Sequence, residues 1–154
     1  MLLDTLLELL HGGHAHATFG AAVKNLPFDK TGLRPRGAPY SAWELVEHMR
    51  LAQNDILRFS REPEYASPPW PEGYWPKKRA PRDEAEWKKS LAAFRRDLRA
   101  FERLLAERAA ELDTPFPWGQ GQTLYREALL IADHNAYHVG QLVLVRKLLG
   151  VWAG

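Results

Sequence analysis

Apolar residues recur at helical spacing along four long stretches of the chain, and breaks rich in proline and glycine separate these stretches. The pattern predicts helices over about residues 2–25, 41–60, 83–112 and 123–150, with no convincing strand and no internal repeat. The third stretch has its apolar residues in alternating steps of four and three, at Trp87, Leu91, Phe94, Leu98, Phe101 and Leu105. That spacing is typical of a seam between gently supercoiled helices. Four long helices without strands favour an all-α protein built as a four-helix bundle.

Short local signals mark where several of these helices begin, weaken or end. Ser41 followed by Glu44 is a capping-box pattern, in which the two side chains satisfy free amides at a helix start. Gly150 is a natural residue just beyond the end of the last helix, because glycine adopts left-handed backbone angles without strain. The adjacent pair Gly12 and Gly13 predicts a weak point or kink within the first helix.

The connection over residues 61–82 contains six prolines and no helical period, and its 22 residues are unusually many for a link within a helical bundle. An extended segment of that length reaches about 70 Å, whereas the preceding helix is about 30 Å long. The connection can therefore return along the bundle and leave the second and third helices parallel, which predicts up-down-down-up topology. Its aromatic residues Tyr65, Trp70, Tyr74 and Trp75 are open to two interpretations, a lid or substrate wall and an apolar strap that seals the bundle.

Composition and charge narrow the class of protein. The 154 residues, 45% hydrophobic and 26% charged, have the balance of an ordinary globular chain, and residues 1–154 are expected to form one domain. The absence of cysteine excludes a disulfide scaffold, a cysteine-ligated zinc finger, an iron–sulfur centre and a protein thiol nucleophile. A net charge of +2 predicts no strong field for nucleic acid or membrane, and neither is expected as a partner. No secretory leader or bilayer-length apolar run is recognised, which makes the cytoplasm the expected compartment.

Three histidines lie on stripes of apolar residues and are expected to point into the bundle. His134 and His138 are one helical turn apart on the apolar face of the last helix, an i, i+4 pair that can hold one metal ion. His48 lies on the apolar face of the second helix, together with Leu45 and Ile56. Three neutral imidazoles make an open zinc-type site with a remaining position for water or substrate. The alternative is that each histidine is a buried, hydrogen-bonded residue of the core.

Two segments around these histidines resemble a known family. The segments LVEHMRLAQNDIL in the second helix and DHNAYHVGQLVLVRKLLG in the last are similar to those of the DinB-like superfamily of metal-dependent enzymes. The resemblance covers most of the chain, and the stretch YHVGQ is its most specific part. It implies an up-down-down-up bundle in which His48, His134 and His138 bind a divalent metal, commonly zinc or nickel, often in a homodimer. Characterised relatives include thiol S-transferases that use bacillithiol or similar low-molecular-weight thiols, and a mycothiol-dependent isomerase.

Three functions are compatible with this pattern. The first is a metal-dependent enzyme that acts on a small-molecule substrate by thiol transfer or hydrolysis, and the resemblance favours thiol transfer. Because the chain has no cysteine, the thiol must then come from a small-molecule cofactor. The second is a non-enzymatic binding module whose metal is structural or sensory. The third is a metal-free bundle that works only through dimer contacts.

Asp55 and Glu127 are the candidates for catalytic carboxylates. Each lies seven residues from a histidine on the same helix, about 20° from it around the axis and roughly 10 Å along it. If the second and last helices are antiparallel, both carboxylates fall on the same side of the metal, in a polar layer that can orient a ligand or act as a general base. The alternative is that they pair with arginines such as Arg58 or Arg126.

His11, His14 and His16 form a second group of histidines near the glycine pair. A histidine-rich tract of this kind can bind metal. Their spacing, however, spreads the three side chains around the helix, which favours an exposed N-terminal cluster without a common ligand.

Overall fold

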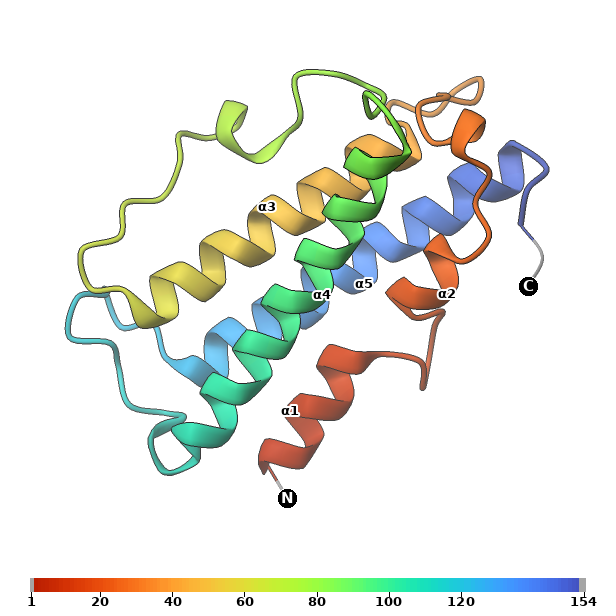
Figure 1. Cartoon of the computed structure of the whole chain (residues 1–154). Coiled ribbons are helices and arrows are strands. Elements are labelled where there is room, and N and C mark those ends of the chain that lie inside the picture. The colour runs from red at the N-terminus through yellow and green to blue at the C-terminus, as the bar shows by residue number, and fades with distance from the viewer. Residues whose placement is uncertain (1, 153–154) are drawn as a thin grey trace.

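A computed structural model of the chain describes residues 2–152, which form five α-helices and no strand (Figure 1). The helices are α1 (Leu2–His11), α2 (Phe19–Val23), α3 (Ala42–Arg61), α4 (Glu84–Glu107) and α5 (Leu124–Leu148). Single turns of 3₁₀ helix lie in the connections at Phe28–Lys30, Glu72–Tyr74 and Ala109–Glu111. The all-α class expected from the apolar pattern is confirmed. None of the helices in residues 2–152 combines the length and the apolar character that crossing a bilayer requires.

The N-terminal stretch differs from the continuous helix predicted over residues 2–25. Helix α1 ends directly before Gly12 and Gly13, which have left-handed backbone angles (φ +68° and +95°) that an α-helix cannot continue. Helix α2 begins after Thr18, whose side-chain oxygen accepts a hydrogen bond from the Ala21 amide. The glycine pair therefore breaks the helix instead of kinking it, and both pieces pack against α5.

The longer helices begin and end close to the predicted positions. Ser41 and Glu44 form the predicted capping box of α3, with each side chain accepting from the other residue's backbone amide. Helix α4 ends at Glu107, before the predicted end near residue 112, because its last turn tightens into a 3₁₀ turn. Gly150 has the left-handed angle (φ +70°) expected of a glycine just beyond α5.

Helices α3 and α4 run in the same direction. In the first half of both helices the Ser90 hydroxyl donates to Glu47, and further along both helices Asn54 donates to Asp97 at 2.9 Å. The residue numbers of the paired positions rise together, which antiparallel helices would not allow. Figure 1 shows how the connection over residues 61–82 makes this possible, since it returns along α3 to the level at which α3 began.

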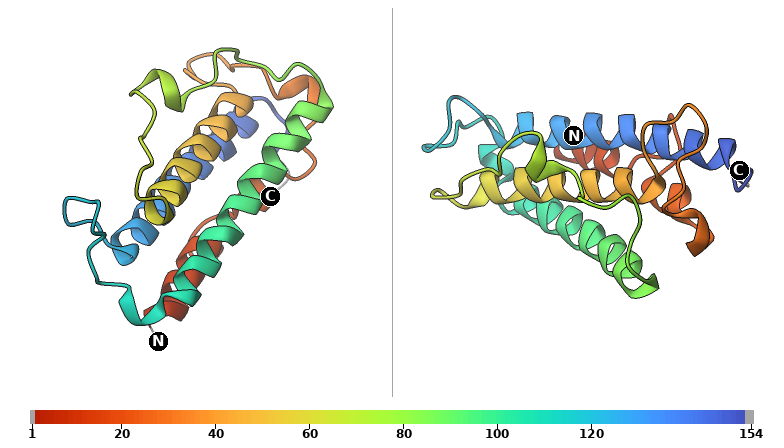
Figure 2. Two further views of the ribbon diagram at one scale, coloured as in Figure 1. Left: turned by 60° about the vertical axis from the view of Figure 1, so that its left-hand side comes forward. Right: turned by 90° about the horizontal axis from the view of Figure 1, so that it is seen from above.

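Helix α5 runs in the opposite direction to α3. The rings of His48 and His138 lie 4.6 Å apart, whereas Gln53, further along α3, accepts a hydrogen bond from Asn135, which is earlier in α5. Figure 2 shows the two helices side by side, and Figure 1 shows α1 running in the direction of α5. This packing is compatible with the predicted four-helix bundle and its up-down-down-up order.

Two clusters of buried apolar side chains form the core, one that includes α2 and Phe94 and one that includes α1 and Phe101. Between them lies a buried pair of amides. Gln53 donates to the Phe94 carbonyl at 2.7 Å and accepts from the Asn135 amide at 3.0 Å. These bonds connect α4, α3 and α5 in a single layer, and they fix how the helices are aligned because buried polar groups need partners.

Arg146, near the end of α5, is buried and holds α2 in place. Its Nη1 donates to the carbonyl of Ala22 at 2.7 Å, and its Nη2 donates to the carbonyl of Val151 at 2.8 Å. The guanidinium also lies 5.1 Å from the centre of the Trp152 ring. One side chain thus satisfies a carbonyl at the end of α2 and fastens the segment that follows α5.

The substitution Arg146→Met should lower the free energy of unfolding by about 1–3 kcal/mol, because the buried Ala22 carbonyl then has no donor. Lys147→Met, at the exposed neighbouring position, is the matched control and should change stability by less than about 0.5 kcal/mol. Urea unfolding followed by circular dichroism measures both variants. Equal effects would show that the buried contacts of Arg146 contribute nothing to stability.

Candidate metal centre

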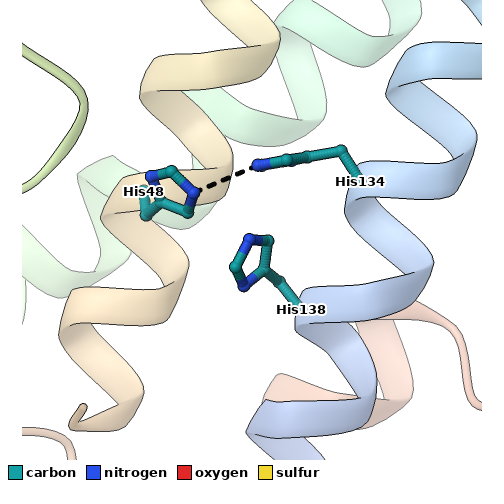
Figure 3. Close-up of side chains that lie close together, drawn as sticks. All are labelled: His48, His134 and His138. Atoms are coloured by element: carbon teal, nitrogen blue, oxygen red, sulfur yellow. Dashed lines mark hydrogen bonds between the residues drawn. The ribbon is translucent and has the colours of Figure 1, made fainter. Parts of the chain in front are cut away.

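His48, His134 and His138 come together between α3 and α5, as Figure 3 shows. One ring nitrogen from each side chain lies within 4.8 Å of the others, and His48 Nε2 is 3.1 Å from His134 Nε2. His48 and His138 are buried, and His134 is partly exposed. The structure therefore brings together all three histidines that the apolar stripes predicted to point inward.

Hydrogen bonds fix the protonated nitrogen of two of these rings. His48 Nδ1 donates to the Tyr74 backbone carbonyl at 2.8 Å, and His138 Nδ1 donates to Gln141 Oε1 at 2.7 Å. Because both partners are acceptors, each Nδ1 carries the proton and each Nε2 keeps its lone pair. Acceptors of this kind behind an imidazole hold its ring in place and increase its basicity toward a metal.

Burial keeps the three imidazoles neutral. It lowers the pKa of His48 and of His138, in each case against the effect of the hydrogen bond at Nδ1. Burial, together with the neighbouring imidazoles of His138 and His48, lowers the pKa of His134 to about 4. Neutral histidine is the form that binds a metal ion, so the site needs no proton release near neutral pH.

The geometry and the donor set fit a divalent transition metal. Two imidazole nitrogens bound tetrahedrally to zinc at 2.0–2.1 Å lie about 3.3 Å apart. The distance of 3.1 Å between His48 Nε2 and His134 Nε2 is close to that value. No carboxylate of residues 2–152 belongs to the cluster, so the ligands that it could offer to a metal are the three imidazoles.

The cluster opens on a pocket of about 550 Å³ with mostly aromatic walls. Trp75 stacks flat on the His48 ring, with ring centroids 3.9 Å apart and planes 3° from parallel. Tyr40 in turn stacks on Trp75, with ring centroids 4.3 Å apart. Trp70 and Tyr137 also line the pocket, although 69% of the surface of Trp70 and 65% of that of Tyr137 are exposed. Trp70, Tyr74 and Trp75 of the 61–82 connection therefore form a wall of the pocket, whereas Tyr65 is not part of the lining.

Comparison with known families agrees with the sequence resemblance. The family model of the DinB superfamily matches residues 14–142. The chain belongs to the DinB superfamily. The matched range includes α2, α3, α4 and α5 up to Leu142, with all three histidines, whereas α1 lies outside it. Comparisons with curated proteins and with solved structures found no match.

The two candidate carboxylates of this DinB-superfamily chain occupy different environments. Asp55 lines the pocket, and its Oδ2 accepts from the Tyr74 hydroxyl at 2.8 Å. Glu127 is 2% exposed, pairs with Arg126 at 2.5 Å and is not part of the pocket lining. Burial raises the pKa of Glu127, and the charge of Asp55 raises it further while Arg126 opposes both. Asp55 therefore reaches the pocket, whereas Glu127 has the arginine partner that the alternative interpretation named.

The N-terminal histidines stay apart from the centre. His11, His14 and His16 are exposed, and none of them belongs to the three-histidine cluster. His11 instead lies 3.5 Å from Glu102 on α4. The structure thus agrees with an exposed N-terminal group of histidines.

Two residues that orient the histidines were not predicted. Gln141 follows His138 by three positions, so helical spacing alone would have placed it beside the ring. Tyr74 acts on His48 through its backbone carbonyl from a proline-rich connection. No sequence pattern identifies a carbonyl in this role, because every residue has one.

Metal-free protein should lose stability as the pH falls from about 6.5 to about 4. His134 takes up its proton near pH 6.5 in the unfolded chain but near pH 4 in the folded one. Between these values the unfolded state binds more protons, so the free energy of unfolding falls with pH. Urea unfolding at about pH 7.5 and about pH 5 should show that the free energy of unfolding falls less between these two pH values in His134→Gln than in the unchanged protein. His14→Gln, at an exposed position, is the control, and an unaltered pH dependence in His134→Gln would contradict the prediction.

Proposed function

We propose that this DinB-superfamily chain is a metal-dependent enzyme that acts on a small-molecule substrate by thiol transfer or by hydrolysis. The observation that supports the proposal is the cluster of three neutral histidines at the base of an open pocket. A structural metal site is normally closed by a fourth protein ligand, whereas a catalytic site keeps a position open. The volume of about 550 Å³ is also in the range of pockets that hold small molecules.

His48, His134 and His138 would hold the metal, and zinc and nickel both suit three imidazoles. A divalent cation bound there supplies a Lewis acid, which favours the deprotonated form of a thiol or water and polarises a carbonyl group. The protein's own groups keep the ligands ready. The Tyr74 carbonyl and the Gln141 side-chain oxygen keep the protons of His48 and His138 at Nδ1, which leaves each Nε2 free for the metal. Trp75 excludes water from one face of the His48 ring.

Thiol transfer is the preferred reaction, and it rests on the resemblance to DinB-like S-transferases. Because the chain has no cysteine, the sulfur must come from a low-molecular-weight thiol such as bacillithiol. The mostly apolar aromatic walls of the pocket suit an organic acceptor next to that thiol.

The finer parts of the proposal concern topology and assembly. The parallel α3 and α4 and the antiparallel α5 support an up-down-down-up four-helix bundle. On α5, Leu144 and Leu148 are exposed, and Gly140 leaves open space where a side chain would stand. A helix face of this kind suits close contact with a second copy of the chain, which supports the predicted homodimer. A cytoplasmic location stays a prediction from the sequence.

Protein purified without an affinity tag should contain about one divalent metal ion per chain by elemental analysis. The variant His138→Ala should lose the metal, because only two of the three imidazole ligands remain. Circular dichroism should still show its helices. His14→Ala, at an exposed position outside the cluster, should keep its metal. Unchanged occupancy in His138→Ala would overturn the assignment of the ligands.

Metal-loaded protein should join bacillithiol to an electrophilic acceptor, such as an activated aryl chloride, faster than chelator-treated protein does. In this reaction a carbon–sulfur bond forms, the carbon–chlorine bond breaks, and chloride and the thiol proton are released. A panel of activated esters tests hydrolysis in the same way. Metal-bound protein that is inactive with every acceptor and every ester would favour the non-enzymatic binding module.

A further inference from the structure

The pocket beside the histidines contains a single formally charged side chain. Of the residues that line it, Asp55 is acidic, none is lysine or arginine, and the three histidines are the candidate metal ligands. The rest of the lining consists of aromatic and aliphatic side chains, namely Tyr40, Ala52, Ile56, Trp70, Tyr74, Trp75, Leu130 and Tyr137. The protein's own contribution to the charge of this pocket is therefore negative, and it is concentrated at the Asp55 end.

No lysine or arginine of residues 2–152 forms an ion pair with Asp55, although the positive charge of Arg58 acts on it from outside the pocket. Its Oδ2 accepts from the neutral Tyr74 hydroxyl, and its buried Oδ1 accepts no hydrogen bond, although the Tyr65 hydroxyl lies near the carboxylate. Burial and the neighbouring Asp55 raise the pKa of both Tyr65 and Tyr74 to about 12, so the hydroxyl groups near the carboxylate stay protonated. A buried acceptor oxygen without a donor is unusual and marks a place where a further donor would be stabilised.

The arginines nearest to these carboxylates are already engaged. Arg58 donates to Glu62 through Nε at 2.9 Å and through Nη2 at 2.8 Å, and its guanidinium lies 4.1 Å above the Tyr65 ring. Arg126 pairs with Glu127. Neither of them lines the pocket. A cation that balances Asp55 from the pocket side must therefore come from a ligand.

The aromatic residues close to Asp55 suit the same kind of ligand. The rings of Trp70 and Tyr74 lie 5.5 Å apart, and Trp70 and Tyr137 keep more than half of their surface exposed while lining the pocket. Aromatic faces attract organic cations, and they do so more strongly when a carboxylate is nearby and water is partly excluded.

We propose that this pocket recognises an organic ammonium ion, with Asp55 balancing its charge and the rings of Trp70, Tyr74 and Tyr137 enclosing its apolar part. The proposal deepens the proposed function, since it names the class of molecule that the same pocket takes. Asp55 lies two helical turns from His48, about 10 Å along α3. A substrate or thiol with its ammonium group about 10 Å from its reactive atom thus spans the pocket from Asp55 to the histidines.

Three probes of nearly equal shape test the preference for positive charge: 2-phenylethylammonium, the neutral 2-phenylethanol and the anionic phenylacetate. Binding to the full chain is followed by calorimetry and by the total tryptophan fluorescence, to which Trp70 and Trp75 of the pocket contribute, without metal and again after metal loading. In metal-free protein the ammonium ion should bind about tenfold more tightly than the alcohol, and phenylacetate should bind most weakly. Because this arm needs no metal, its outcome is independent of whether the metal-dependent activity exists.

Variants separate the charge of Asp55 from its structural contact. Asp55→Asn should abolish the advantage of the ammonium ion over the alcohol, whereas Tyr74→Phe removes the same hydrogen bond but keeps the charge and should retain the advantage. Asp133→Asn, at an exposed position outside the pocket lining, is the matched control for charge. Equal binding of ammonium ion and alcohol by the unchanged protein, tighter binding of phenylacetate in the metal-free protein, or a full advantage in Asp55→Asn would each overturn the proposal.

Discussion

The alignment of α3 against α5 is the constraint on which the rest of the site depends. Gln53 and Asn135 are buried on facing helices, and the hydrogen bond between their amides is possible in one alignment of the two helices. A slip by one turn would leave these groups buried without partners, at a cost of about 1–3 kcal/mol for each. In the alignment that allows this hydrogen bond, His48 lies opposite the turn of α5 that carries His134 and His138.

The site also depends on a segment that belongs to no long helix. Tyr74 connects the two ends of the pocket, because its carbonyl accepts from His48 and its hydroxyl donates to Asp55. The next residue, Trp75, stacks on His48. The 61–82 connection is thus more than the long link that parallel α3 and α4 require. It orients one histidine and supplies the wall that faces it.

Burial has opposite consequences for the bases and the acids of this region. It is the largest cause that keeps the imidazoles neutral and therefore able to bind a metal. A buried carboxylate needs a positive partner or a proton instead. Glu127 has Arg126 as its ion-pair partner, whereas the hydrogen bond that Asp55 accepts comes from a neutral hydroxyl. This contrast makes Asp55, and not Glu127, the group through which the pocket selects the charge of a ligand.

Sequence alone determined the features that arise within one helix. The apolar stripes identified the inward direction of His48, His134 and His138, and the pattern of Ser41 and Glu44 identified the start of α3, because helical spacing relates such residues to one another. The glycine pair near residue 12 signalled a weak point, but the tertiary structure was needed to show that the helix breaks there and that both pieces pack against α5.

Only the tertiary structure decided the contacts between distant segments. Asp55 and Glu127 stand in equivalent positions relative to their histidines, yet one meets the 61–82 connection and the other meets an arginine. The Tyr74 carbonyl and the stacked rings of Tyr40 and Trp75 reach the site from segments without helical period. Where such a segment lies is set by packing against the finished helices, and that information is not present in any local spacing of residues.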